Sequence, residues 1–142
     1  MPMSAIRLSS EPDGAPEDAA AIEDRINNFN MRVTGDADYR PIRIFLRDEN
    51  GALRGGITAG VWGGWLDIYF LWVDEDLRKQ DYGTQLLAAA EDEARGYGCR
   101  NVHVSTFSFQ ARPFYERFGY QVIATLEDFP PGHSHYHLRK AL

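Results

Sequence analysis

The chain has 142 residues, a net charge of −6 and a single cysteine, Cys99. This length supports one domain, residues 1–142, with a core of its own. The acidic balance argues against a nucleic-acid binder, which normally carries a basic face. One cysteine excludes an internal disulfide framework. No apolar run is long enough to span a membrane, and the N-terminus lacks a signal-peptide pattern. We therefore expect a cytoplasmic protein that binds neither nucleic acid nor membrane.

The N-terminal half predicts a short strand, a helix and an antiparallel meander. Ile6–Leu8 alternates as a strand does, and Glu17-Asp18 place acids in the first turn of a helix. That helix is expected to run to about Val33. Three strands are expected to follow, at residues 42–46, 53–61 and 65–73. The turns between them are Asn50-Gly51, a hairpin signal, and Gly63-Gly64. Gly55-Gly56 indicates a bulge or a close backbone approach.

The C-terminal half continues with a helix from Gly83 to about Tyr97, which Gly98 ends. A strand at 101–106, a helix at 110–118 and strands at 120–126 and 135–142 complete the list. The strand ending at Val73 is apolar on both faces and is therefore expected to be central. The helix after it links two parallel neighbours by a right-handed crossover. The expected fold class is α/β, with a mixed, mainly antiparallel sheet flanked by helices.

A charged turn separates the strand ending at Val73 from the following helix. A strand, a turn and a helix in this order aim several backbone amides and the helix dipole at one spot, which suits a phosphate. Arg78, Asp81 and Gly83 give this segment a resemblance to the acetyl-CoA loop of the GNAT superfamily of N-acetyltransferases, Gln/Arg-x-x-Gly-x-Gly/Ala. Asp81 departs from the pattern, and its carboxylate would repel a pyrophosphate unless it points outward.

The resemblance covers nearly the whole chain and implies the GNAT fold. In that fold the strand ending at Val73 and the one beginning at Asn101 splay apart and admit the pantetheine arm of acetyl-CoA, the acetyl donor. No metal is implied. The residues expected to bind the donor are Leu71, Trp72, Val73, Arg78, Lys79, Gln80, Asp81, Tyr82, Gly83, Thr84, Ser108 and Phe114.

The resemblance also implies two catalytic residues. Residues 111–120 are similar to the GNAT segment Ala-x-x-Phe-Tyr-x-x-x-Gly-Phe, in which the Tyr, here Tyr115, protonates the departing thiolate. Helical spacing alone would make Tyr115 a core aromatic. Counted back from Arg78, Asp67 falls where GNAT histone acetyltransferases place a Glu general base. A base is needed because an alkylammonium of pKa about 10.4 must lose a proton before it attacks. The alternative is a carboxylate that only faces solvent.

The histidines near the C-terminus suggest a metal cluster at first sight. Alternation puts only His135 and His137 on one face, and no Cys or paired carboxylate joins them, so we expect no metal. His133 lies on the loop that overhangs the acceptor in this fold, and Asn30 lies in the other expected acceptor segment. Both are expected to bind the acceptor. His103 is interpreted as a strand residue without a catalytic role.

These observations lead to a hypothesis of acetyl transfer to a primary amine. The acceptor is a small molecule such as an aminoglycoside or a polyamine, or a protein, and the net negative charge is compatible with a cation. The alternative is a non-catalytic acyl-CoA-binding or regulatory module of the same fold. A third interpretation is a scaffold that only oligomerises. A homodimer is compatible with the fold.

Overall fold

The computed structural model describes residues 4–36 and 38–142, which form two compact units that divide at residue 37. The N-terminal unit contains helix α1, Pro16–Thr34. Pro16 opens the helix because its missing N–H is not needed there, and Glu17 and Asp18 face the positive end of the helix dipole. Gly35 ends it in the left-handed conformation, where its amide donates to the Met31 carbonyl.

One expectation for this unit is wrong. Residues 6–8 form no strand: Ile6 and Leu8 are almost fully exposed, and no described segment pairs with them. An alternating pattern without a partner cannot satisfy its backbone groups. The predicted helix to about Val33 is confirmed: α1 is continuous through Asn27 and Asn28, where neither a proline nor a glycine interrupts it.

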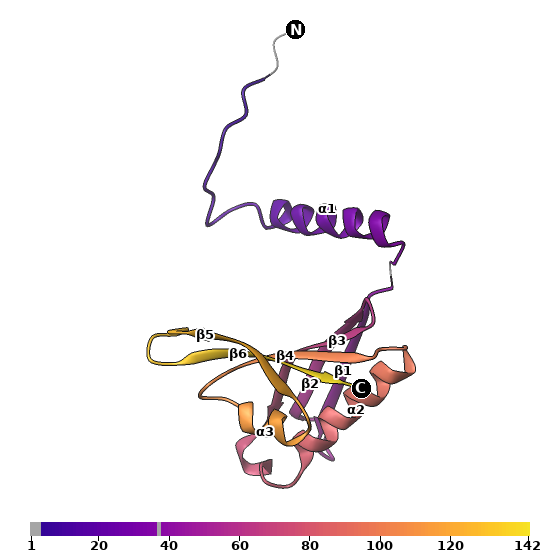
Figure 1. Ribbon diagram of the computed structural model, residues 1–142. Helices are drawn as coiled ribbons and strands as arrows, with labels where there is room; N and C mark the ends of the chain where they lie inside the picture. The colour runs from indigo at the N-terminus through magenta and orange to yellow at the C-terminus, as the bar shows by residue number, and fades with distance from the viewer. Residues whose placement is uncertain (1–3, 37) are drawn as a thin grey trace. The chain divides into compact units, whose positions relative to one another are not determined.

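The C-terminal unit, Asp38–Leu142, is a six-stranded sheet with helices (Figure 1). The strands are β1 Arg40–Arg47, β2 Leu53–Trp62, β3 Trp65–Val73, β4 Asn101–Phe107, β5 Gln121–Glu127 and β6 Ser134–Ala141. The helices are the short 3-10 helix η1 Glu75–Leu77, α2 Tyr82–Gly96 and α3 Arg112–Arg117. The strand order is β1-β2-β3-β4-β6-β5, and β3–β4 is the one parallel pair of this sheet. The mixed, mainly antiparallel α/β fold is confirmed.

The glycines of the meander set its geometry. Gly51, Gly63 and Gly64 have positive φ, as the tight turns between strands require. Gly55 lies where β2 and β3 approach closely, since a Cβ there would stand 2.6 Å from the Trp72 carbonyl oxygen. The expected close approach at Gly55-Gly56 is therefore confirmed.

The core lies between the sheet and α2. Leu86, Leu87 and Ala90 on α2 are at most 2% exposed, as are Ile57, Leu66 and Val102 on the sheet. Glu91 extends this helix face as a buried carboxylate, which accepts from the Tyr120 hydroxyl at 2.9 Å and pairs with Lys140 at 2.8 Å. The polar residues of β3, β4 and β6 alternate with the buried ones and therefore project from the opposite side, which we call the outer face.

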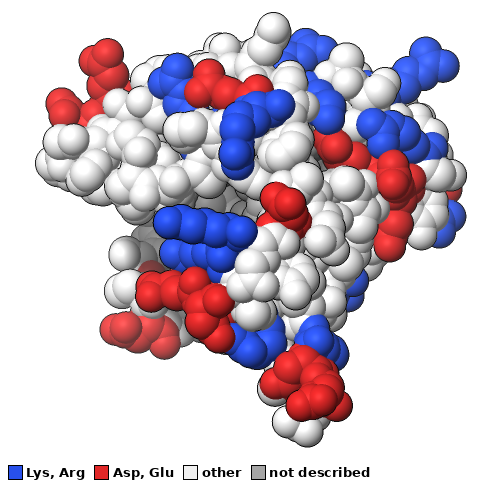
Figure 2. Space-filling model, turned by 90° about the horizontal axis from the view of Figure 1, so that it is seen from below, with Lys and Arg blue, Asp and Glu red and all other residues white. Residues whose placement is uncertain are grey.

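The surface carries charges of both signs. Figure 2 shows Lys and Arg side chains interspersed with Asp and Glu over the face that it presents. Such a mixed pattern differs from the continuous basic footprint of nucleic-acid-binding domains. Among the described helices, none is long and apolar enough to cross a membrane.

Candidate active site

The central parallel strands separate partway along their length. β3 and β4 pair from Trp65 and Asn101 up to Ile68 and Val104, and then stop, although both strands continue. The pairing of β2 with β3 shifts by one residue beside this point, so that Tyr69 is an extra residue in β3 and bends the strand. We call the unpaired segment beyond Ile68 and Val104 the strand opening. One backbone edge of β3 faces it without a strand partner in the described chain, which suits an amide-rich ligand.

The loop after β3 presents amides at the start of α2. Lys79 and Asp81 both have left-handed backbones, with φ of 65° and 66°. The first hydrogen bond of α2 runs from the Gln85 amide to the Asp81 carbonyl at 3.0 Å, so the amides of residues 82–84 have no acceptor within the helix. Asp81 is exposed and makes no capping bond to the helix. Alternating backbone conformations, free amides and the helix dipole together fit an anion such as a pyrophosphate.

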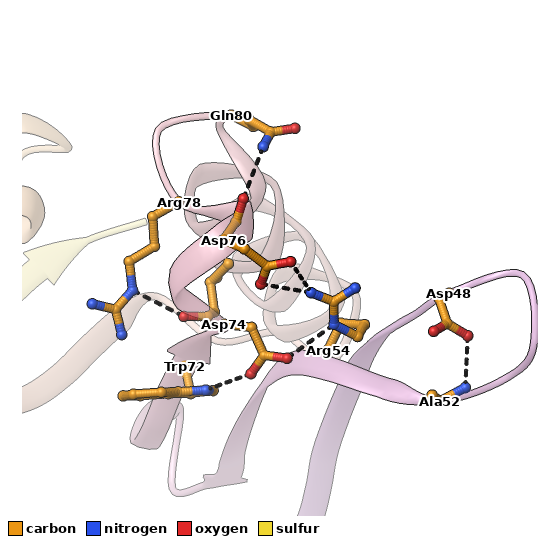
Figure 3. A network of polar contacts seen from close by, with 9 residues as sticks. Asp48, Ala52, Arg54, Trp72, Asp74, Asp76, Arg78 and Gln80 are labelled. Carbon is orange, nitrogen blue, oxygen red and sulfur yellow. Dashed lines mark hydrogen bonds and ion pairs between the residues drawn. The ribbon is translucent and has the colours of Figure 1, made fainter.

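An arginine on β2 holds the start of this loop (Figure 3). The Arg54 Nε donates to Asp74 at 2.9 Å, and its Nη2 donates to both oxygens of Asp76 at 2.6 and 2.5 Å. The Trp72 indole N–H donates to the other Asp74 oxygen at 3.0 Å. The bonds from Arg54 and then Trp72 lower the pKa of Asp74. Two acidic side chains beside the anion loop are thus held away from it by one guanidinium.

Arg78 lies on the other side of this network, also visible in Figure 3. Its Nε donates to the Val73 carbonyl at 3.0 Å, and its guanidinium lies 4.7 Å from the centre of the Trp72 ring. These two contacts anchor the side chain and leave both terminal nitrogens for an anion. The structure therefore places Arg78 beside the end of β3, where the sequence predicts a positive charge.

Tyr115 lies on α3, which follows β4. Tyr115 is 4% exposed, and its ring packs edge to face against the rings of Phe114 and Tyr120. Burial raises its pKa to about 12, so the phenol is protonated at neutral pH. Burial is the one cause of this shift and no hydrogen bond contributes to it, so among the described residues the hydroxyl has no partner and its proton is available to a ligand. Phe114 lies 3.5 Å from the position that a Cβ on Gly83 would take, so α3 is packed beside the start of α2.

Asp67 lies on the outer face at the closed end of the strand opening. Its carboxylate accepts from His103 Nδ1 at 2.9 Å, and His103 Nε2 lies 2.9 Å from His137 Nδ1. His103 lies on a strand, as predicted, and its ring also joins Asp67 to His137. Asp67 and His103 are 36 positions apart and meet because β3 and β4 pair in register. That register, and not a local motif, is the signal that could have linked them.

The predicted acceptor residues lie in different parts of the structure. His133 Nδ1 is 3.5 Å from the Ser108 hydroxyl, which also accepts from the Ser134 amide at 3.0 Å. Ser108 therefore fixes the β5–β6 loop to the end of β4. Asn30 belongs to α1 in the N-terminal unit. An aromatic cluster that no sequence pattern indicates lies beside the loop, where the His135 ring stacks on Phe107 and Phe129.

Comparison with known proteins assigns the family. Residues 5–120 match the family model described as the acetyltransferase (GNAT) family. The chain belongs to the GNAT family of acetyltransferases. It is 38% identical over 116 residues to a blasticidin-S acetyltransferase of Streptomyces morookaense, covering 79% of this chain and 85% of that protein. It is 34% identical over 127 residues to an acetyltransferase of Agrobacterium fabrum, covering 89% and 91%.

A solved structure supports the same assignment. The crystal structure of an acetyltransferase from Bacillus cereus has a TM-score of 0.83 and 33% sequence identity, and the match covers 94% of this chain and 98% of that one. The GNAT resemblance is thus confirmed, and this GNAT protein is an N-acetyltransferase.

Proposed function

We propose that this GNAT protein transfers the acetyl group of acetyl-CoA to a primary amine of a small molecule. The observation that carries the proposal is the strand opening, which leads directly to the anion loop before α2. The backbone edge of β3 suits the amide-rich pantetheine arm of CoA, and the amides of the loop suit its pyrophosphate. These two features follow one another in the same order as the two groups in CoA. The blasticidin-S acetyltransferase relative supports a small-molecule acceptor.

The donor would lie along the end of β3. Its pyrophosphate is placed on the amides of residues 79–84, with Arg78 and Lys79 supplying positive charge. Its pantetheine arm is placed along the backbone of Leu71, Trp72 and Val73. The remaining residues assigned to the donor, Gln80, Asp81, Tyr82, Gly83, Thr84, Ser108 and Phe114, line the loop and the opposite side of the opening.

The reaction would be direct attack. The free amine attacks the thioester carbonyl, the C–S bond breaks, and the sulfur leaves with the electron pair and takes the Tyr115 proton. A backbone N–H near Val73 polarises the carbonyl. Because the pKa of Tyr115 is about 12 and that of an alkyl thiol is about 8.5, full transfer in the ground state is uphill by roughly 5 kcal/mol. Proton transfer must therefore accompany C–S cleavage. In this proposal Asp67, on the outer face, or an ordered water takes the proton of the amine.

In this proposal His133 contributes to the choice of acceptor, and Asn30, in the N-terminal unit, is a separate candidate for acceptor binding. A cationic amine suits the net charge of −6. Blasticidin S, aminoglycosides and polyamines are the first compounds to test, and a protein amine is the alternative acceptor. The proposal treats residues 1–142 as one acetyltransferase domain, cytoplasmic and compatible with a homodimer.

The experiment measures donor binding and turnover separately. Calorimetry with CoA reports binding, while release of free thiol detected with DTNB, together with mass spectrometry of the amine, reports transfer. We expect thiol release that depends on the amine, and a mass increase of one acetyl group. CoA binding without transfer to any amine of the panel would favour the non-catalytic acyl-CoA-binding module instead. The absence of CoA binding would overturn both.

A further inference from the structure

Three side chains from three strands form one hydrogen-bonded row on the outer face. Asp67 on β3 joins His103 on β4, and His103 joins His137 on β6, with both contacts at 2.9 Å. The rings of His103 and His137 are nearly parallel, with an interplanar angle of 16°. Asp67 and His103 are half-buried, with side chains 50% and 32% exposed. This row lies outside the anion loop and the Tyr115 helix.

The bonding pattern dictates where the protons lie. A carboxylate accepts only, so Nδ1 of His103 carries a proton and donates to Asp67. In neutral His103 the second nitrogen, Nε2, is then an acceptor, and Nδ1–H of His137 donates to it. The lone pair that remains on the imidazoles is at Nε2 of His137. Both nitrogens of His103 are occupied, so it connects the other two residues and cannot itself meet a substrate.

The register places His137 level with the start of the strand opening, across β4 from it. His137 lies opposite Ser105 on β4, one residue beyond Val104, where the pairing of β4 with β3 stops. Asp67 lies one residue before Ile68, at the closed end. The row therefore runs from β3 at the closed end of the opening, across β4, to β6 at the level where the opening begins.

The surroundings keep His137 neutral at rest. Burial, and then the neighbouring rings of His103 and His135, lower its pKa, while the charge of Asp67 opposes this effect. The other ionisable groups of the outer face near the row are Tyr69 on β3, whose hydroxyl lies 3.1 Å from that of Tyr39, and Arg139 on β6. Arg139 donates to Asn101 and lies over the Trp65 ring. On β5 the residue opposite His137 is Ala124, which cannot titrate.

We propose that His137 Nε2 accepts the proton of the acceptor amine, and that His103 and Asp67 are its positioning residues. This inference rests on the proposed function and moves the proton-accepting atom from Asp67 to His137. An imidazole is the better match, because its ordinary pKa lies about 4 pH units below that of an alkylammonium, against about 6.5 for an Asp carboxylate. The carboxylate instead fixes the tautomers and stabilises the charge that forms.

The proton balance closes within the row. An N–H bond of the ammonium breaks and its proton bonds to Nε2 of His137, which leaves the electron pair on the amine for attack. The proton on Nδ1 of His137 passes to Nε2 of His103. His103 is then an imidazolium paired with the Asp67 carboxylate, and His137 is neutral again. The one positive charge of the ammonium has moved to His103.

The first test observes the imidazoles directly in the free protein. Long-range ¹H–¹⁵N spectra of ¹⁵N-labelled protein should show the proton of His137 on Nδ1 and a free Nε2. The pKa of His137 should fall in Asp67→Asn, because the negative charge that favours the imidazolium is lost. A proton on Nε2 of His137 at neutral pH, or an unchanged titration in Asp67→Asn, would overturn the proposal.

The second test uses the pH profile of kcat/KM for an amine that the wild type acetylates. His137→Gln should lower kcat at pH 7 at least tenfold and remove the lower limb of the profile, and Asp67→Asn should move that limb to lower pH. His135→Phe is the matched control, since it keeps the aromatic stack and lies outside the row. It should retain the lower limb, moved to higher pH because a ring that lowers the pKa of His137 is removed. An active wild type with an unchanged His137→Gln profile would overturn the role of His137 and leave the acetyltransferase function standing. A wild type that binds CoA but acetylates no amine would overturn both.

Discussion

Two buried tyrosines with rings 5.5 Å apart should respond in opposite ways to the same change. Tyr115→Phe removes a hydroxyl that bonds to no described residue, so the free energy of unfolding should change little. In the proposed reaction it removes the proton donor to the thiolate. We expect kcat to fall at least roughly tenfold, within the usual range of 10²–10⁴ for general acid catalysis, while the affinity for CoA stays nearly the same.

Tyr120→Phe should do the reverse. The Tyr120 residue is 2% exposed and its hydroxyl donates to Glu91 at 2.9 Å. A hydrogen bond to a charged group is worth about 1.5–3 kcal/mol, and the lower end applies because Glu91 keeps its ion pair with Lys140. With an unfolding entropy of about 2.1 cal/mol/K per residue, a loss of about 1.5 kcal/mol in a chain of this length lowers Tm by roughly 5 °C.

Calorimetric unfolding and steady-state kinetics at 25 °C separate the two variants. Tyr115→Phe should keep Tm and lose kcat, and Tyr120→Phe should lose Tm and keep kcat. Equal losses of Tm would show that the Tyr115 hydroxyl has a structural partner. Wild-type turnover in Tyr115→Phe would show that water or another group protonates the thiolate.

Three further predictions concern the loop and pH. Asp81→Gly should bind CoA severalfold more tightly, because it removes a negative charge, and should raise Tm, because it removes about 1 kcal/mol of left-handed strain. Asp81→Asn removes the charge but keeps the strain. Titration calorimetry should therefore show tighter CoA binding in this variant, without the rise in Tm. Arg54→Gln removes the guanidinium that binds Asp74 and Asp76 beside the anion loop. This variant should raise the KM for acetyl-CoA more than it lowers kcat. An unchanged KM would show that the loop keeps its conformation without Arg54. The pKa of Tyr115 is about 12 in the folded protein and about 10 in the unfolded chain. Its contribution to the free energy of unfolding is therefore complete below pH 10, and about 2.7 kcal/mol is lost as the pH rises to 12. Urea unfolding between pH 9 and 12 should show this decline in the free energy of unfolding, and Tyr115→Phe should reduce it.

The sequence predicted the sheet well where local chemistry determines it. Strand β3 begins and ends at the predicted residues, Trp65 and Val73, because glycines and a charged turn bound it. The strand expected at Ile6–Leu8 failed because alternation describes one strand and does not supply a partner for it. A pattern along the chain is therefore a dependable guide to a segment and a weaker one to its pairing.

The residues of the candidate site also differ in how far the sequence predicts them. The anion loop and Tyr115 lie on continuous segments whose order and spacing carry the information. The row of Asp67, His103 and His137 joins three strands that are distant along the chain. It requires the strand order and the register of two pairings, neither of which the composition of any strand reveals. The left-handed backbone at Lys79 has no sequence signal either, since lysine does not favour it.

The strand order has a consequence for how the site forms during folding. β1, β2 and β3 follow one another through short turns, whereas β4 reaches β3 only across α2, and β6 reaches β4 across α3 and β5. Contacts that close short loops form at lower entropic cost, so we expect the meander to belong to the folding nucleus and the β4–β6 pairing to follow it. The strand opening lies at the boundary between these two parts. Substitutions on its β4 and β6 side should therefore change the unfolding rate more than the folding rate.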